Sequence, residues 1–228
     1  RALAPLRNLS LPSLNLRRYV SLPPLPLPPF GRVLIAELRL LLKGLPWWWY
    51  AGALGLIIAG ALNGGDPNAR RGLLGVAWIW PVLIWSQLGV REKTHHTGPI
   101  IFSAPKPLRR QFVAMWIGGV LVTLLTGSGV GLRLLTAGAW GHLLGWGAAV
   151  LFIPTLALAL GIWSGTSKFF EALYVVLWYI GPMQRLDIFD YMGLSSAALA
   201  KGMPYIYLGI TAALLIAALF GRRRQISR

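Results

Sequence analysis

The sequence predicts an all-α, polytopic integral membrane protein, in which an N-terminal interfacial helix precedes a bundle of six membrane-spanning helices. The first observation is composition: 56% of the 228 residues are hydrophobic and only 12% are charged, about half the charged fraction of soluble proteins. The second is a series of long apolar segments with Trp and Tyr at several of their ends, as in membrane proteins. The third is a net charge of +16. The basic residues flank the apolar segments, which indicates an anionic lipid surface as the partner and not a nucleic acid.

The chain begins with a proline-rich stretch, residues 1–30, which contains LPSLNLRRYVSLPPLPLPPF. Repeated proline prevents a continuous helix and favours an extended path. We therefore expect a tail or a linker, with a motif for an aromatic binding groove as the alternative. Because the first residue is not Met, we also expect a processed chain or a fragment of a longer protein.

Residues 31–45, GRVLIAELRLLLKGL, are predicted to form an amphipathic helix. At about 100° per residue, Arg32, Arg39 and Lys43 fall within roughly 40° of one another, and apolar side chains cover most of the remaining surface. A narrow basic stripe on an apolar helix suits the headgroup boundary of a membrane. The alternative is a short buried helix that ends at Gly44.

Six apolar segments follow and together form the predicted transmembrane domain, residues 46–221. A straight span needs about 20 residues, and only the fifth segment is clearly shorter, so we expect it to be tilted, extended or broken. The last segment leads into GRRRQISR, which predicts a basic cytoplasmic tail at residues 222–228. The segments are residues 46–63, 72–90, 112–128, 139–163, 169–182 and 203–221.

The distribution of basic residues predicts the orientation of these spans. With six spans, 17 of the 22 Lys and Arg residues lie on the side that holds both termini. Cytoplasmic loops carry the excess of positive charge in membrane proteins. Both termini and the loop at residues 91–111 are therefore predicted to be cytoplasmic, in a multi-pass protein of the cell membrane.

The residues that would mark an enzyme or a cofactor site do not occur in recognisable patterns. The chain has no Cys, which excludes disulfides, thiol catalysis and Cys-based metal sites. It contains no phosphate-binding loop of the Walker type, no H-E-x-x-H and no G-x-S-x-G. His142 alone among three His lies near a span, so paired haem ligation is not expected. We predict no catalytic residue, no cofactor and no metal site.

The polar loop VREKTHHTGPIIFSAPKPLRRQ, residues 90–111, separates the second and third apolar segments. A Glu follows the second segment; a Thr-containing turn, an apolar pair, SAP and basic residues then lead into the third. This order resembles the cytoplasmic connection in ABC transporter permeases of the type-2 exporter class. The stretch FIPTLALALGIWSGTSKFFEALYVVLWYIGP is similar to the fourth-to-fifth span region of bacterial members, and AELRLLLKG before WWWY is similar to their N-terminal interfacial helix.

The resemblance covers roughly residues 31–221 and implies a permease subunit whose transport is driven by a separate cytosolic ATP-binding subunit. It also implies a second permease copy or homologue as partner. In that family the interfacial helix and the loop after the second span dock the ATP-binding subunit. Here these are residues 31–44 and 91–111, and the implied partner-coupling residues are Arg32, Arg39, Glu92, Lys93, Thr94, Thr97, Pro105, Arg109 and Arg110.

Elementary chemistry is consistent with a docking role for this loop. Its prolines restrict the backbone, Thr94 or Thr97 is placed to cap a short helix, and its charged residues offer ion pairs to a partner. The alternative is that Arg109 and Arg110 only anchor the span ends. Glu92 is less easily explained in that way, because acidic residues contribute little to topology.

Glu171 has two interpretations. It lies three residues after Lys168 near the start of the fifth segment, which predicts an i,i+3 ion pair. It is also a candidate for the mouth of a translocation path, because charged residues in membrane segments are frequently functional. For the whole chain, the main alternative is a structural membrane-anchor subunit without transport activity; a membrane-embedded enzyme is the least favoured.

Overall fold

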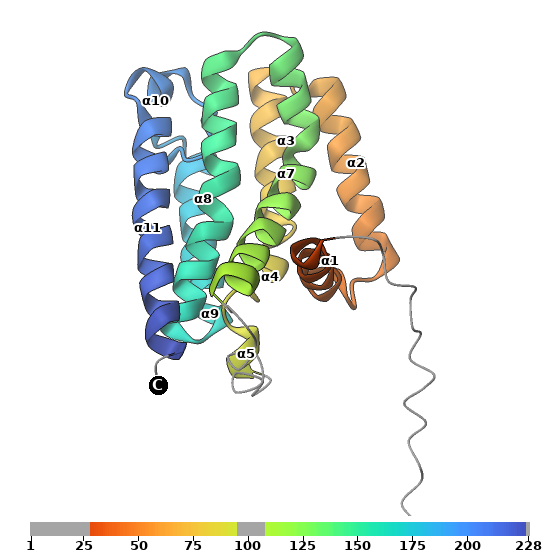
Figure 1. Cartoon of the computed structure of the whole chain (residues 1–228). Helices are drawn as coiled ribbons and strands as arrows, with labels where there is room; N and C mark the ends of the chain where they lie inside the picture. The colour runs from red at the N-terminus through yellow and green to blue at the C-terminus, as the bar shows by residue number, and fades with distance from the viewer. Residues whose placement is uncertain (1–27, 95–107, 227–228) are drawn as a thin grey trace, which may run out of the picture.

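The computed structural model describes residues 28–94 and 108–226, and every regular element in these two ranges is a helix (Figure 1). This confirms the predicted all-α class. The proline-rich stretch lies, up to residue 27, outside the described residues. The elements are α1 (Pro29–Leu42), α2 (Trp47–Asn63), α3 (Pro67–Ile79), α4 (Val82–Trp85), α5 (Arg91–Thr94), the π-helical turn η2 (Leu108–Phe112), α7 (Val113–Thr136), α8 (Trp140–Ser164), α9 (Ser167–Trp178), the π-helical turn η3 (Tyr179–Met183), the 3₁₀ turn η4 (Asp187–Phe189), α10 (Ser196–Ala200) and α11 (Met203–Ile226).

Among the described residues, three helices are long and apolar enough to cross a membrane: Arg110–Thr136, Trp140–Ser164 and Met203–Gln225. A fourth candidate is the pair Phe30–Leu42 and Trp47–Asn63, which is bent by 104° at the break between its two helices. These apolar helices indicate a membrane protein. Within the two described ranges, however, the second and fifth predicted segments are not single unbroken helices of spanning length.

Local chemistry explains why the second segment is broken. The Asp66 carboxylate caps the start of α3 by accepting a hydrogen bond of 2.7 Å from the backbone N–H of Ala69, and Pro67 occupies the first helical turn. The helix ends at Ile79, two residues before Pro81, because proline lacks the N–H that would continue the ladder. Only the short α4 follows.

The α-helical pattern of the fifth segment is also interrupted near a proline. Thr166 caps α9 through its hydroxyl, which accepts a hydrogen bond from the Lys168 N–H. After Trp178 the α-helical pattern gives way to η3, which contains Pro182. The segment was expected to be tilted, extended or broken; the structure shows helix from Ser167 to Met183, slightly longer than the apolar segment, with a π-helical last turn that contains Pro182.

The centre of the bundle is formed by α7 and α8, which pack against each other; α7 also packs against α2, and α8 against α11. Glycine permits the closest of these approaches. A methyl group placed on Gly129 of α7 would overlap the carbonyl oxygen of Ile57 on α2, and one on Gly60 would lie 3.0 Å from the Val130 nitrogen. The backbones of α2 and α7 are thus nearly in contact, as small residues allow in membranes.

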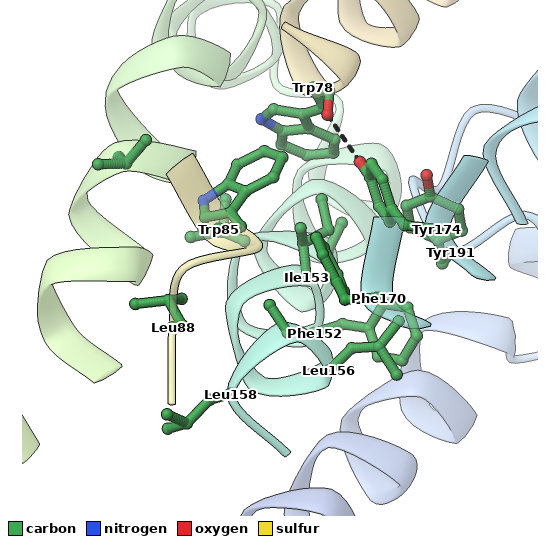
Figure 2. Packing of buried hydrophobic residues seen from close by; sticks show 14 of the residues in the cluster. Trp78, Trp85, Leu88, Phe152, Ile153, Leu156, Leu158, Phe170, Tyr174 and Tyr191 are labelled. Carbon is green, nitrogen blue, oxygen red and sulfur yellow. Dashed lines mark hydrogen bonds between the residues drawn. The ribbon is translucent and has the colours of Figure 1, made fainter. Parts of the chain in front are cut away.

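An aromatic cluster fills the core between α3, α4 and α9 (Figure 2). Trp78, Trp85, Phe170 and Tyr174 are fully buried. The rings of Phe170 and Tyr174 stack with centroids 5.2 Å apart, and Trp85 meets Tyr174 edge-on at 5.9 Å. Such pairs contribute beyond their buried area, so the cluster fixes the two interrupted segments against each other.

One hydrogen bond in this cluster leads to a testable prediction. The Tyr174 hydroxyl donates to the carbonyl oxygen of Trp78 at 2.8 Å (Figure 2), in the last turn of α3, where carbonyls have no helical partner. Tyr174→Phe is expected to lower the free energy of unfolding by about 1–3 kcal/mol, because a buried carbonyl loses its donor. Denaturant titration in mild detergent measures this. Tyr205→Phe, at a residue that is 68% exposed, is the control; equal effects of the two changes would contradict the prediction.

Candidate functional site

The site lies at the end of the bundle that carries α5 and the C-terminal end of α11 (Figure 1), and ion pairs connect α5 to α11 and to α1. The connection between α8 and α9 is at the same end (Figure 1). The polar loop at residues 91–111 starts here with α5 and returns to the bundle through η2. This is the end predicted to face the cytoplasm.

A buried ion pair joins the start of the loop to the last helix. The Arg222 guanidinium donates to both carboxylate oxygens of Glu92, at 2.5 Å and 2.9 Å. The two side chains are only 3% and 6% exposed. The Gln111 amide donates to the same carboxylate at 3.0 Å, and the Gln225 carbonyl accepts from Arg222 at 3.3 Å. A two-pronged Arg–carboxylate pair fixes geometry as well as charge.

The last helix extends into the residues predicted as the C-terminal tail. Residues 222–226 do not form a separate segment: α11 continues to Ile226, and Arg222 is buried. The Gln225 amide donates to the carbonyl oxygen of Ile162 at 2.9 Å, which holds the end of α11 against α8. The helix continues past the apolar segment because a carboxylate inside the protein compensates the charge of Arg222.

A second ion pair joins the loop to the first helix. Arg91 lies 3.5 Å from the carboxylate of Glu37 on α1, and the Glu37 residue is 7% exposed. Arg91 and Glu92 are consecutive residues of α5, yet they bind helices on different sides. The base of the loop is therefore held between α1 and α11.

The structure separates the residues predicted to couple to a partner into distinct groups. Glu92 is buried and paired within the chain, so its carboxylate does not lie on a surface that another subunit can contact. Lys93 is exposed and lines a pocket of about 200 Å³ together with Trp163 and Arg224. Three further basic residues are exposed at or near this end of the fold: Arg32, Arg39 and Arg110.

The remaining predicted coupling residues are only partly described. Thr94 is the last residue of α5, and its hydroxyl donates back to the carbonyl oxygen of Val90 at 3.3 Å. Capping of a short helix by Thr94 or Thr97 stays a prediction, because the chain that follows Thr94 lies outside the described residues. Arg109 belongs to η2, and Thr97 and Pro105 lie outside the described residues.

Sequence reasoning missed Glu37, Arg91, Gln111 and Arg222. A signal was present for Glu37, because the chain has only six acidic residues and this one lies in an apolar helix. A carboxylate in such a place is costly unless it has a partner. No comparable local signal identifies Arg222, which is 130 residues from Glu92.

The predicted ion pair at the start of α9 is present. The Lys168 ammonium lies 2.8 Å from the Glu171 carboxylate, and the lysine side chain is 81% exposed. The pair connects positions i and i+3 of one helix, as expected for a local surface interaction. A role for Glu171 in a translocation path stays a prediction.

The opposite end of the bundle carries a second polar group, in the connection between η3 and α11. The Asp190 carboxylate accepts hydrogen bonds from the N–H groups of Leu194 and Ser195 at 3.1 Å and 2.7 Å, while burial raises its pKa. Asp187 accepts a hydrogen bond of 2.8 Å from Lys201, which lowers the pKa of that carboxyl. These bonds hold η4 and α10 together over the end of the helices, as a cap.

The two ends thus differ in what their charges do. The carboxylates of the cap accept hydrogen bonds from their own connection, whereas the ion pairs at the α5 end join three separate helices through one short turn.

No protein-family model, curated protein or solved structure matches this chain, so a function is assigned to it from the sequence pattern and from the geometry described above.

Proposed function

We propose that this chain is the membrane-spanning permease subunit of an ABC-type transporter, driven by a separate cytosolic ATP-binding subunit. The observation that carries the proposal is the base of the polar loop. There α5 is tied to α1 by Glu37–Arg91 and to α11 by Glu92–Arg222. A force on the loop is thereby passed to the first and the last helix of the bundle.

The mechanism follows from where these helices pack. The α1 helix packs on α7, and α11 packs on α8. Closure of two ATP-binding subunits would push on the loop, and the ion pairs would pass this displacement to both packed pairs. A second permease copy or homologue would form the other half, and tilting of the halves would alternate access to a path between them.

The proposal includes the finer topology. It takes α2, the broken α3–α4 segment, α7, α8, the α9–η3 segment and α11 as six spans, with α1 at the interface. The placement of 17 of the 22 basic residues on one side supports cytoplasmic termini. Glu92 then acts as a positioning residue for the loop, and the exposed residues Lys93 and Arg110 are the candidates for contact with the ATP-binding subunit.

Purification of the tagged full chain in mild detergent tests this proposal. We expect a soluble protein that hydrolyses ATP to co-purify with it. Arg110→Glu is expected to reduce the recovered ATPase activity roughly tenfold or more, because like charges facing each other across an interface cost several kcal/mol. The control is Arg133→Glu, the same charge change at an exposed arginine near the other end of α7.

Two results would contradict the proposal. One is recovery of a larger membrane complex that contains no nucleotide-hydrolysing component, which would favour a structural anchor subunit. The other is an equal loss of ATPase with Arg110→Glu and with Arg133→Glu, which would show that the α5 end is not the docking surface.

A further inference from the structure

An apolar groove of about 480 Å³ lies between α1, α2 and α7. This volume is in the range of sites that bury a small organic ligand. Leu38 and Leu42 contribute from α1, which meets α2 at an angle of 104°. Ala53 and Leu54 line the groove from α2, and Val122 lines it from α7.

The lining favours a hydrocarbon over a polar ligand. Its two hydroxyl groups are both used within the chain. The Tyr50 hydroxyl donates to the carbonyl oxygen of Leu42 at 3.0 Å, and the Thr126 hydroxyl donates to that of Val122 at 3.0 Å. A polar ligand would lose its water without gaining hydrogen bonds from these groups.

Basic side chains lie immediately beside the groove. Each groove-lining leucine of α1 is followed by a cation, Arg39 after Leu38 and Lys43 after Leu42. Both cations are exposed, and so is Arg32, which shares their stripe on α1. The one acidic residue of α1, Glu37, is buried and paired with Arg91. The exposed side of the helix next to the groove is therefore positively charged.

We propose that this groove binds one acyl chain of an anionic phospholipid, with the lipid phosphate held by Arg39 and Lys43 of the basic stripe. The inference requires that the helices lie in a bilayer, and it does not depend on transport. A second copy of the chain is a poorer occupant. In a symmetric dimer formed through this face, the basic stripes of the two copies would face each other. Like charges that face each other at an interface are unfavourable.

Native mass spectrometry of the purified full chain tests the proposal. Phosphatidylglycerol and phosphatidylcholine with identical acyl chains are titrated separately. We expect phosphatidylglycerol to bind at least roughly tenfold more tightly, since each basic residue near an anionic surface contributes about 1 kcal/mol. By the same constant, Arg39→Gln is expected to weaken phosphatidylglycerol binding about fivefold. Phosphatidylcholine binding is expected to weaken less, because its choline cation offsets the charge of the phosphate that both lipids carry.

Two further variants distinguish a site from general attraction. Leu54→Trp, at a lining residue that is 57% exposed, is expected to fill the groove and to reduce the number of bound phosphatidylglycerol molecules by one. Arg223→Gln removes an exposed arginine of α11 that does not line the groove, and is expected to leave the binding unchanged.

The inference is overturned if the two lipids bind equally, or if Arg223→Gln weakens binding as much as Arg39→Gln. It is also overturned if Leu54→Trp changes the oligomeric state and leaves lipid binding as it was, because the groove is then an interface between copies. None of these results affects co-purification of an ATPase, so failure here is distinguishable from failure of the transport proposal.

Discussion

Arg222→Met is expected to lower the free energy of unfolding by about 3–5 kcal/mol, the usual cost of removing one partner from a buried ion pair. The Glu92 carboxylate would lose both of its guanidinium donors and would stay buried, with the Gln111 amide as its donor among the described contacts. Methionine keeps most of the side-chain volume, so little of the loss would come from a cavity. Denaturant titration in mild detergent, followed by Trp fluorescence, measures the change.

Two further variants serve as controls for this result. Lys168→Met breaks the exposed pair with Glu171 and is expected to change stability by no more than about 0.5 kcal/mol. The double variant Glu92→Met with Arg222→Met is expected to recover most of the lost stability, because a buried pair is often replaced by apolar residues at little cost. If Arg222→Met costs no more than Lys168→Met, the pair does not stabilise the fold.

The same double variant separates stability from coupling. It is expected to fold while α5 is no longer tied to α11 by charge. Under the proposed function, the co-purified ATPase would still bind but would no longer drive transport. Full transport by this variant would show that the Glu92–Arg222 connection does not transmit force.

Gly129→Ala is expected to lower the free energy of unfolding by about 3 kcal/mol, the upper end of the usual cost of overpacking. The new methyl group would overlap the carbonyl oxygen of Ile57. A backbone atom cannot rotate away as a side chain can, so α2 and α7 would have to separate. Their separation would also loosen neighbouring contacts such as the approach of Gly60 to Val130. Thermal and denaturant unfolding of the purified chain measure the effect.

The matched control is Gly55→Ala on α2, where a methyl group would meet no other atom within 4 Å. This change is expected to stabilise the protein by about 0.5–1 kcal/mol, because Ala is the better helix former. The close crossing of α2 and α7 would be contradicted if both glycine substitutions had the same sign.

Much of the fold was predictable from local properties of the sequence. Composition and apolar segments predicted an all-helical membrane protein, and the structure confirms the helical class. The spacing of Lys168 and Glu171 predicted their ion pair, since residues three apart on a helix are neighbours whatever the tertiary fold. Pro81 lies at the break in the second segment, and Pro182 lies in the π-helical turn of the fifth. A hydropathy average does not register the loss of one N–H group, so the second segment was counted as long enough to span a membrane.

The sequence pointed to the segment that contains the candidate site, but it did not predict the contacts made there. The polar loop drew attention to Glu92, but its partner Arg222 is 130 residues away, and Arg222 looked like one more basic residue of a tail. The ion pair between Glu37 and Arg91, which are 54 residues apart, was not predicted either. Which carboxylate meets which guanidinium depends on the order and rotation of the packed helices.

The sequence by itself determined the chemistry: which segments are apolar, where proline stops a helix, and how charge is distributed along the chain. Hydropathy, helix period and proline geometry act over a few residues, so they can be read without the fold. The tertiary structure alone decided that Glu92 faces inward, that α5 is held between α1 and α11, and that an apolar groove lies beside the basic stripe of α1. Contacts of this kind depend on distances between helices, and no local pattern in the chain specifies those distances.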